Sequence, residues 1–147
     1  MIHAFIFLYH TILGSPIYFS DGSSTTTEMS GVVRSHLRFG STNYQWNNAS
    51  ITVTDLTIQY GNNEKILLVK FSKFTVSGGN QDLWCGHYLA LDGNQMCSRK
   101  NGPSIGYWIN YSLDRSQNSV LFNFSATSTA DPWARGFSFE YVGMISF

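Results

Sequence analysis

The sequence predicts an all-β fold, an antiparallel β-sandwich of the jelly-roll type, and three observations support this prediction. Aromatic residues make up 16% of the chain, and aromatic and β-branched side chains favour strands. Apolar and polar residues alternate in several short segments, which places one face of each segment in a core and the other in water. No long segment shows the apolar spacing of a helix. Two sheets packed face to face satisfy all three observations.

Seven or so strands are expected, separated by turns rich in Gly, Asn and Ser. They lie at 32–39, 51–58, 65–76, 86–91, 105–111, 120–124 and 137–141. In 105–111 the alternating residues are Ile105, Tyr107, Ile109 and Tyr111, which leaves Trp108 on the other face.

Within the segment 65–76, the alternation of apolar and polar residues shifts by one position. Val69 and Phe71 lie on one face, whereas Phe74 falls on the other. Because side chains alternate strictly along a regular strand, this change predicts a β-bulge near Ser72 and Lys73.

The charge balance narrows the classes of partner. The chain has 9 Lys and Arg against 9 Asp and Glu, and only 12% of its residues are charged. Phosphate backbones select basic surfaces, so no nucleic-acid partner is expected. The apolar fraction of 43% is sufficient for a packed core, and the chain has the length of a single domain.

Residues 1–20 are expected to be a signal peptide, or else an N-terminal apolar segment. An apolar run from Ala4 to Leu13 precedes Gly14 and Ser15, as in the cleavage zone of a secretory leader. No basic residue precedes the run, and the alternative is a buried N-terminal strand. The run is too short to span a bilayer as a helix, so no transmembrane segment is expected.

The segment 21–30 is small and polar, which predicts a mobile linker, and the domain is expected to comprise residues 31–147. Three Asn-x-Ser sequons, at Asn48, Asn110 and Asn123, are candidate glycosylation sites. Together with the leader, they favour a secreted, extracellular protein.

Several motifs follow one another between Gly31 and Tyr141. They are Leu56-Thr-Ile58, Leu67-x-Val69-x-Phe71-x-x-Phe74-x-Val76, Cys85-Gly-His-Tyr88-Leu89-Ala-Leu91-Asp92-Gly93, Cys97, Phe124-Ser125 and Gly136-Phe137-x-x-x-Tyr141. Their order and spacing resemble the pattern of CUB domains, which are extracellular β-sandwich modules. The resemblance implies a CUB-like recognition domain.

The cysteines depart from the family pattern. CUB domains have a first disulfide whose second half would stand at Thr54, and no Cys precedes Cys85 here, so both halves of that bridge are missing. The resemblance implies that the remaining pair, Cys85 and Cys97, is bonded. The alternative is two reduced thiols in a cytosolic protein.

The resemblance also bears on calcium. Many CUB domains hold Ca²⁺ with several acids, but Tyr88, Ala126 and Thr127 stand where two of these acids would be, and only Asp131 lies nearby. Because Ca²⁺ requires several carboxylate oxygens, the family's calcium site is expected to be lost. No cofactor or metal is expected.

Catalytic motifs are missing from the sequence: it contains no Gly-x-Ser-x-Gly, no phosphate loop and no His-Glu-x-x-His. The protein is therefore not expected to be an enzyme. The candidate ligand-binding residues belong to the loop end beside the lost calcium site, and they are His87, Tyr88, Trp108, Trp133 and Arg135. The alternative for Trp133 is that it folds back onto the sandwich edge, with Arg135 as a solvated charge.

These observations predict a secreted, non-catalytic, calcium-independent module for recognition or adhesion, with an extracellular protein or a glycan as partner. A homo-oligomer is possible. The alternative is a structural jelly-roll subunit of a trimeric or fibrous assembly, such as a C1q-like head or a viral or phage appendage.

Overall fold

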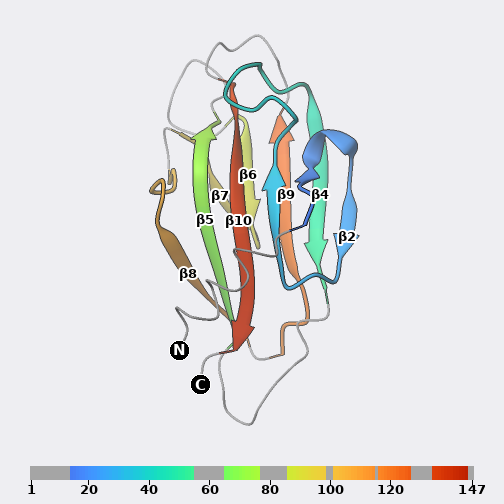
Figure 1. Ribbon diagram of the computed structural model, residues 1–147, viewed down its shortest axis with the longest axis vertical. Helices are drawn as coiled ribbons and strands as arrows, with labels where there is room; N and C mark the ends of the chain where they lie inside the picture. The colour runs from blue at the N-terminus through green and yellow to red at the C-terminus, as the bar shows by residue number, and fades with distance from the viewer. Residues whose placement is uncertain are drawn as a thin grey trace.

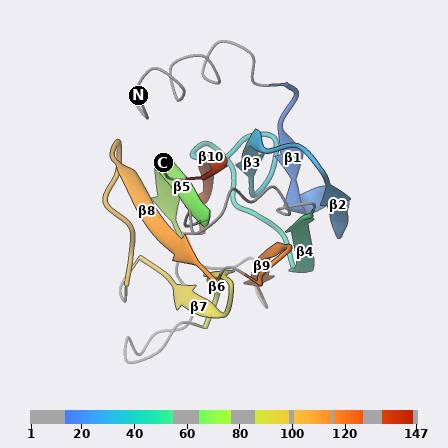
Figure 2. The same cartoon turned by 90° about the horizontal axis from the view of Figure 1, so that it is seen from below.

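The computed structural model describes residues 14–54, 65–76, 86–98, 101–114, 116–126 and 134–145. In these residues, ten strands form two five-stranded sheets that pack face to face (Figures 1 and 2). The predicted all-β sandwich is confirmed.

The two sheets are named A and B. Sheet A has the order β1-β3-β10-β5-β8, with β1 (Ile17–Tyr18), β3 (Ser30–Arg34), β10 (Gly136–Ile145), β5 (Lys65–Thr75) and β8 (Trp108–Leu113). Sheet B has the order β2-β4-β9-β6-β7, with β2 (Ser24–Thr26), β4 (Asn47–Val53), β9 (Val120–Ala126), β6 (Tyr88–Leu91) and β7 (Asn94–Met96). The sheets form the two rows of strands seen in Figure 2.

Most strand pairs are antiparallel, as predicted, but β1 pairs with β3 and β2 pairs with β4 in parallel. The chain runs along β1, returns along β2 in the other sheet and runs forward again along β3. Strands β1 and β3 therefore point the same way at one edge of the sandwich.

The prediction of a mobile linker at 21–30 is wrong, and the sandwich begins before residue 31. The segment contains β2 and follows η1 (Phe19–Asp21), whose Phe19 is fully buried. The polar composition of the segment is typical of a linker, but an edge strand can be held by backbone hydrogen bonds alone. Here Thr54 N donates to Thr26 O at 2.8 Å. Residues 1–13 lie outside the described residues, so cleavage of a leader stays a prediction.

The core between the sheets is largely aromatic. Its fully buried rings include Phe19, Phe71, Phe122, Phe124, Phe137, Phe139, Tyr44 and Tyr141. Many meet edge to face, as Phe124 and Phe137 do with their centroids 5.0 Å apart, and this geometry adds to the gain from burial. The inward faces predicted for 120–124 and 137–141 are confirmed.

The β-bulge lies where the sequence predicts it. Ser138 of β10 pairs with Lys73, and the next residue, Phe139, pairs with Phe71. Ser72 is therefore the extra residue of β5, and its hydroxyl donates to Ser138 O at 3.3 Å.

The predicted strand at 105–111 is wrong in its first half. Ile105 and Tyr107 are 46% and 70% exposed, and β8 begins only at Trp108. Gly106, with φ 86°, turns the backbone between them. Ile109 and Tyr111 do pack against the core.

The outer faces of the two sheets differ. On sheet A, Ile66, Leu68 and Val142 form a second buried cluster with Trp108 packed against it, named here the outer cluster. On sheet B, the outward positions of β4 and β9 are polar except for Leu121, which is 42% exposed, and Asn48 pairs with Ser125 while Ser50 pairs with Asn123.

Candidate functional site

The candidate site is one end of the sandwich, named here the loop end. It comprises residues 35–46, 86–88 and 134–136, where β3, β5 and β9 finish and β4, β6 and β10 begin. In Figure 1 the segment 35–46 is the teal loop that crosses the top of both sheets.

Arg135 ties this segment to the start of β10. Its backbone oxygen accepts from Gly40 N at 2.7 Å, and its Nη1 donates to Ser41 O at 2.9 Å. Beside it, Tyr44 N donates to Ala134 O at 3.0 Å. The exposed guanidinium of Arg135 is therefore held in place by the loop that it contacts.

The loop is further shaped by its own turn. Ser41 N and Thr42 N both donate to Arg38 O at 3.0 Å. Gly40 has a φ of 82°, which favours glycine, and a Cβ there would lie 2.9 Å from Lys73 Nζ. His36 holds the end of this turn in place, because its Nε2 donates to Thr42 O at 2.8 Å.

A serine and a histidine meet under the loop, but in a structural arrangement. Ser35 Oγ lies 2.8 Å from His36 Nδ1, and it also accepts from Phe137 N at 3.0 Å. Ser35 is 1% exposed, and its hydroxyl is occupied by His36 and by the backbone of Phe137. Gly136 packs against this pair so closely that a Cβ would overlap Ser35 Oγ.

His87 is a core residue, and its predicted contact with a ligand is corrected here. It is 2% exposed, and its Nδ1 lies 2.7 Å from the hydroxyl of Tyr44, which is itself buried. The sequence placed His87 correctly near the loop end but did not show which way its side chain points. A buried polar ring needs a hydrogen-bond partner, and Tyr44 supplies it.

The other predicted binding residues are only partly brought together. Tyr88 is half-buried at the start of β6, and Arg135 is exposed at the loop end. Trp108 lies away from this end, because it pairs with Lys70 halfway along sheet A and packs on the outer cluster. Its assignment to the same site is wrong. Trp133 lies outside the described residues.

Three exposed residues at this end were missed from the sequence. Leu37 and Trp46 are 70% and 68% exposed, and Arg38 lies beside Leu37. The sequence predicts a strand over 32–39, which includes Leu37, but β3 ends at Arg34 and the chain turns into the loop there. The one available signal was the polar stretch Gly40-Ser-Thr-Asn43, which marks a loop.

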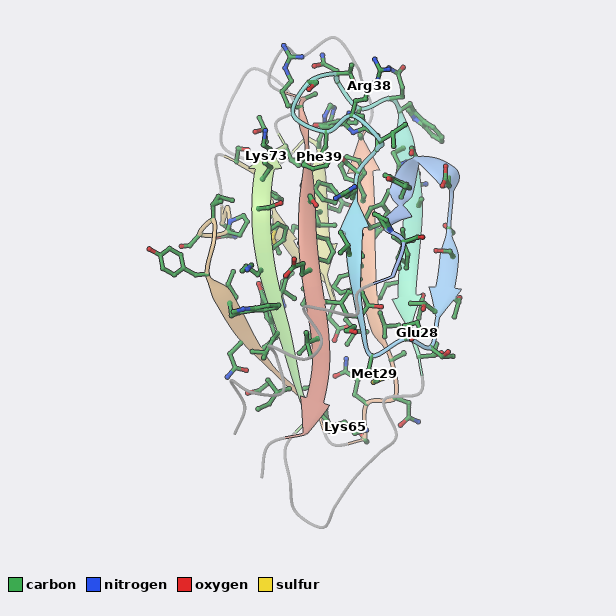
Figure 3. The ribbon with its side chains drawn as sticks, in the orientation of Figure 1. Glu28, Met29, Arg38, Phe39, Lys65 and Lys73 are labelled. Atoms are coloured by element: carbon green, nitrogen blue, oxygen red, sulfur yellow. The ribbon has the colours of Figure 1, made fainter. Side chains whose placement is uncertain are left out.

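The described residues place more basic than acidic side chains toward the loop end. Arg34, Arg38, Lys73 and Arg135 lie there with Asp21, whereas Glu28, Asp92 and Asp114 lie at the other end together with the buried Lys65. Figure 3 shows Arg38 and Lys73 at one end and Glu28 at the opposite one. The guanidinium of Arg34 stacks over Phe39 at 5.1 Å. Hydrogen bonds from Ser116 hold the pKa of Asp114 below its usual value.

Two hollows accompany these ends. One of about 160 Å³ lies under the loop, beside Tyr44 and Trp46. The other, of about 510 Å³, lies at the β1–β2 edge beside Glu28 and Tyr141. Burial raises the pKa of Tyr141 to about 12, and its hydroxyl donates to Glu28 O at 2.9 Å. Tyr141 therefore stays protonated at neutral pH, and its hydroxyl bonds β10 to the segment between β2 and β3.

The described part of the chain has no group of three or more His, Cys, Asp or Glu side chains that could hold a metal ion. Nor does any helix there have the length and apolarity needed to cross a membrane. Asp131 lies outside the described residues, so the loss of the calcium site stays a prediction.

The cysteines and sequons are placed as follows. Cys97 is 3% exposed and belongs to the core, while Cys85 lies outside the described residues, so the bridge stays a prediction. Asn48 and Asn110 are exposed, and Asn123 is half-buried.

A comparison with solved structures identifies the class of fold. The chain is similar to the MASP-1 CUB2 domain, in its crystal structure bound to Ca²⁺, with a TM-score of 0.54 and 14% sequence identity, over 81% of this chain and 96% of that one. No family model and no curated protein matched the sequence. The protein thus has a CUB-like sandwich fold, and at this identity the likeness concerns the fold alone.

Proposed function

We propose that this protein is a secreted, non-catalytic recognition module that binds an extracellular protein or glycan through its loop end. The CUB-like fold supports a binding module, because domains of this architecture present loops on a rigid sandwich. The residue that carries the proposal is Arg135. Its guanidinium is exposed yet fixed by Ser41 O, so little conformational entropy is lost when a partner binds.

The neighbours of Arg135 suit the same role. Leu37 presents an exposed apolar side chain, and Arg38 a second cation. Tryptophan, tyrosine and arginine are the side chains enriched among the residues that dominate binding energy, and Leu37 adds exposed apolar area beside the two arginines. Trp133, two residues before Arg135, is proposed as the aromatic member of this surface.

The proposal is tested by a glycan array and by binding to purified candidate proteins. Trp133→Ala and Arg135→Ala are each expected to weaken binding about thirtyfold or more, the loss typical of a hot spot. Both variants should melt close to the wild type. Asp114→Ala, at the opposite end, is the matched control and should bind normally. Unchanged binding in both loop-end variants would contradict the proposal, and so would a collapse in melting temperature for Trp133→Ala.

Calcium independence is proposed together with this function. A ligand that binds only the folded state raises its stability by mass action, so millimolar Ca²⁺ should leave the melting temperature unchanged. A rise reversed by a chelator would show that Asp131 or another acid forms a calcium site.

The structural-subunit alternative predicts a different assembly. Light scattering of the purified protein should give a monomer or weak dimer for the module and an obligate trimer for the alternative. Intact mass without a reductant tests the proposed Cys85–Cys97 bridge, and two free thiols would argue against both the bridge and secretion.

A further inference from the structure

Two of the three sequons share a feature beyond the Asn-x-Ser motif. A tryptophan stands two residues before the asparagine in Trp46-Asn-Asn48-Ala-Ser50 and again in Trp108-Ile-Asn110-Tyr-Ser112. In the third, Leu121-Phe-Asn123-Phe-Ser125, the same position is a leucine. The chain therefore contains two sequons that a tryptophan precedes, and a third, at Asn123, that serves as an internal control.

The geometry is clearest in β8. Residues two apart in a strand project from the same face, so Trp108 and the exposed Asn110 stand side by side on the outside of sheet A. The indole packs on the outer cluster, and Lys70 Nζ lies 5.2 Å from the ring centroid. Asn110 pairs directly with Leu68 of that cluster. A group attached to Asn110 would therefore lie beside a ring that is already fixed.

Trp46 poses a separate problem, because it is 68% exposed. A large aromatic side chain gains most of its stabilising energy from burial, and most of the Trp46 surface is left uncovered at the rim of the hollow under the loop. It precedes β4, in which Asn48 is exposed. Two residues of chain span at most about 7 Å, so a group attached to Asn48 can reach the indole.

We propose that Asn48 and Asn110 carry N-linked glycans whose first sugar packs against Trp46 and Trp108. In the transfer, the asparagine amide nitrogen bonds to C1 of a lipid-pyrophosphate-linked oligosaccharide, the C1–O bond breaks, the amide loses a proton and the lipid pyrophosphate leaves. The C–H face of an N-acetylglucosamine then packs against the exposed indole of Trp46, and against the part of the Trp108 indole that Lys70 and the outer cluster leave exposed, and this contact buries apolar area. The modification goes beyond the proposed binding function, although both require entry into the secretory pathway.

Asn123 has a different environment. It lies on the central strand β9, directly opposite Ser50 and Ala90, and it is half-buried. Its neighbour two residues before, Leu121, has no ring for a sugar to stack on. A glycan at Asn123 is therefore expected to gain no stability from that neighbour.

The experiment uses the full chain, secreted from a eukaryotic cell behind a foreign leader so that entry into the pathway is assured. Peptide mass spectrometry measures occupancy at the three asparagines. An endoglycosidase then trims each glycan to its first sugar, and melting temperatures are compared. Trp108→Ala is expected to lower the melting temperature by about 2–4 °C more in the glycosylated protein than in an Asn110→Gln background. Trp46→Ala with Asn48→Gln should show the same coupling.

The matched control is Leu121→Ala with Asn123→Gln, which should show no coupling. An unoccupied Asn110 or Asn48, or an equal loss of melting temperature with and without the glycan, would overturn the inference. Neither result affects the proposed function, because Arg135→Ala is tested for binding in the Asn48→Gln, Asn110→Gln protein. Failure of that binding test alone would refute the loop-end proposal and leave the glycans in place.

Discussion

Strands β5 and β9 lie within opposite sheets, and the comparison between them shows two ways of building a strand. In β9 burial alternates: Phe122 and Phe124 are fully buried, while Leu121 and Asn123 face outward. In β5 every residue from Lys65 to Val69 is buried. One strand therefore has a single buried face, and the other has two.

The difference lies in what covers the outer face. Ile66 and Leu68 point away from the main core yet are each only 7% exposed, because they pack with Val142 and Trp108. The corresponding face of sheet B has Asn48, Ser50, Asn123 and Ser125, which tolerate water. Sheet A is thus stabilised from both sides, and its outer cluster is a second, smaller core.

The largest effect is expected on the inner face that both strands share. Phe124→Ala in β9 should cost about 3–5 kcal/mol of unfolding free energy, because the ring packs against Phe19, Tyr44 and Phe137 and leaves a cavity. Chemical denaturation measures the loss, provided that the wild type and the variant have the same m-value. A cost below about 1 kcal/mol would mean that the core of sheet B collapses to fill the site.

The outer faces should separate the two strands. Leu68→Ala in β5 is expected to cost about 2–4 kcal/mol, as for a core leucine. Its counterpart Asn123→Ala in β9 should stay within about 0.5 kcal/mol. If the two losses were equal, the outer cluster would not act as a second core.

Tyr141 of β10 links the inner face to the β1–β2 edge, and its stability contribution depends on pH. Its pKa is raised to about 12 by burial, above the value near 10 of a free tyrosine. The contribution is complete below pH 10 and falls between pH 10 and 12 by about 1.4 kcal/mol per pH unit. Denaturation at several pH values checks this, and Tyr141→Phe should lose most of the slope.

The smallest effect is expected at the polar rim of the outer cluster. Lys70 Nζ lies 4.0 Å from Glu140 Oε2, and both side chains are partly exposed. Glu140→Gln should change stability by no more than about 0.5 kcal/mol. Thermal melts at low and high salt test this, and a loss above about 1 kcal/mol would show that the pair is effectively buried.

The candidate site was less predictable than the fold. The sequence correctly placed Arg135 and Tyr88 near one end, since both flank predicted strands at their loop ends. It could not place Trp108 or orient His87, because the residues that decide these positions are distant in the chain. Tyr44, which bonds His87, lies 43 residues away.

By itself, the sequence determined the all-β sandwich, the inward faces of β9 and β10 and the bulge at Ser72, because each follows from the two-residue periodicity of a strand. The tertiary structure alone decided that Ser24–Thr26 forms an edge strand, that both faces of β5 are buried and that Arg135 is fixed by Ser41. These features depend on which distant segments meet, and local side-chain alternation has no information on such contacts.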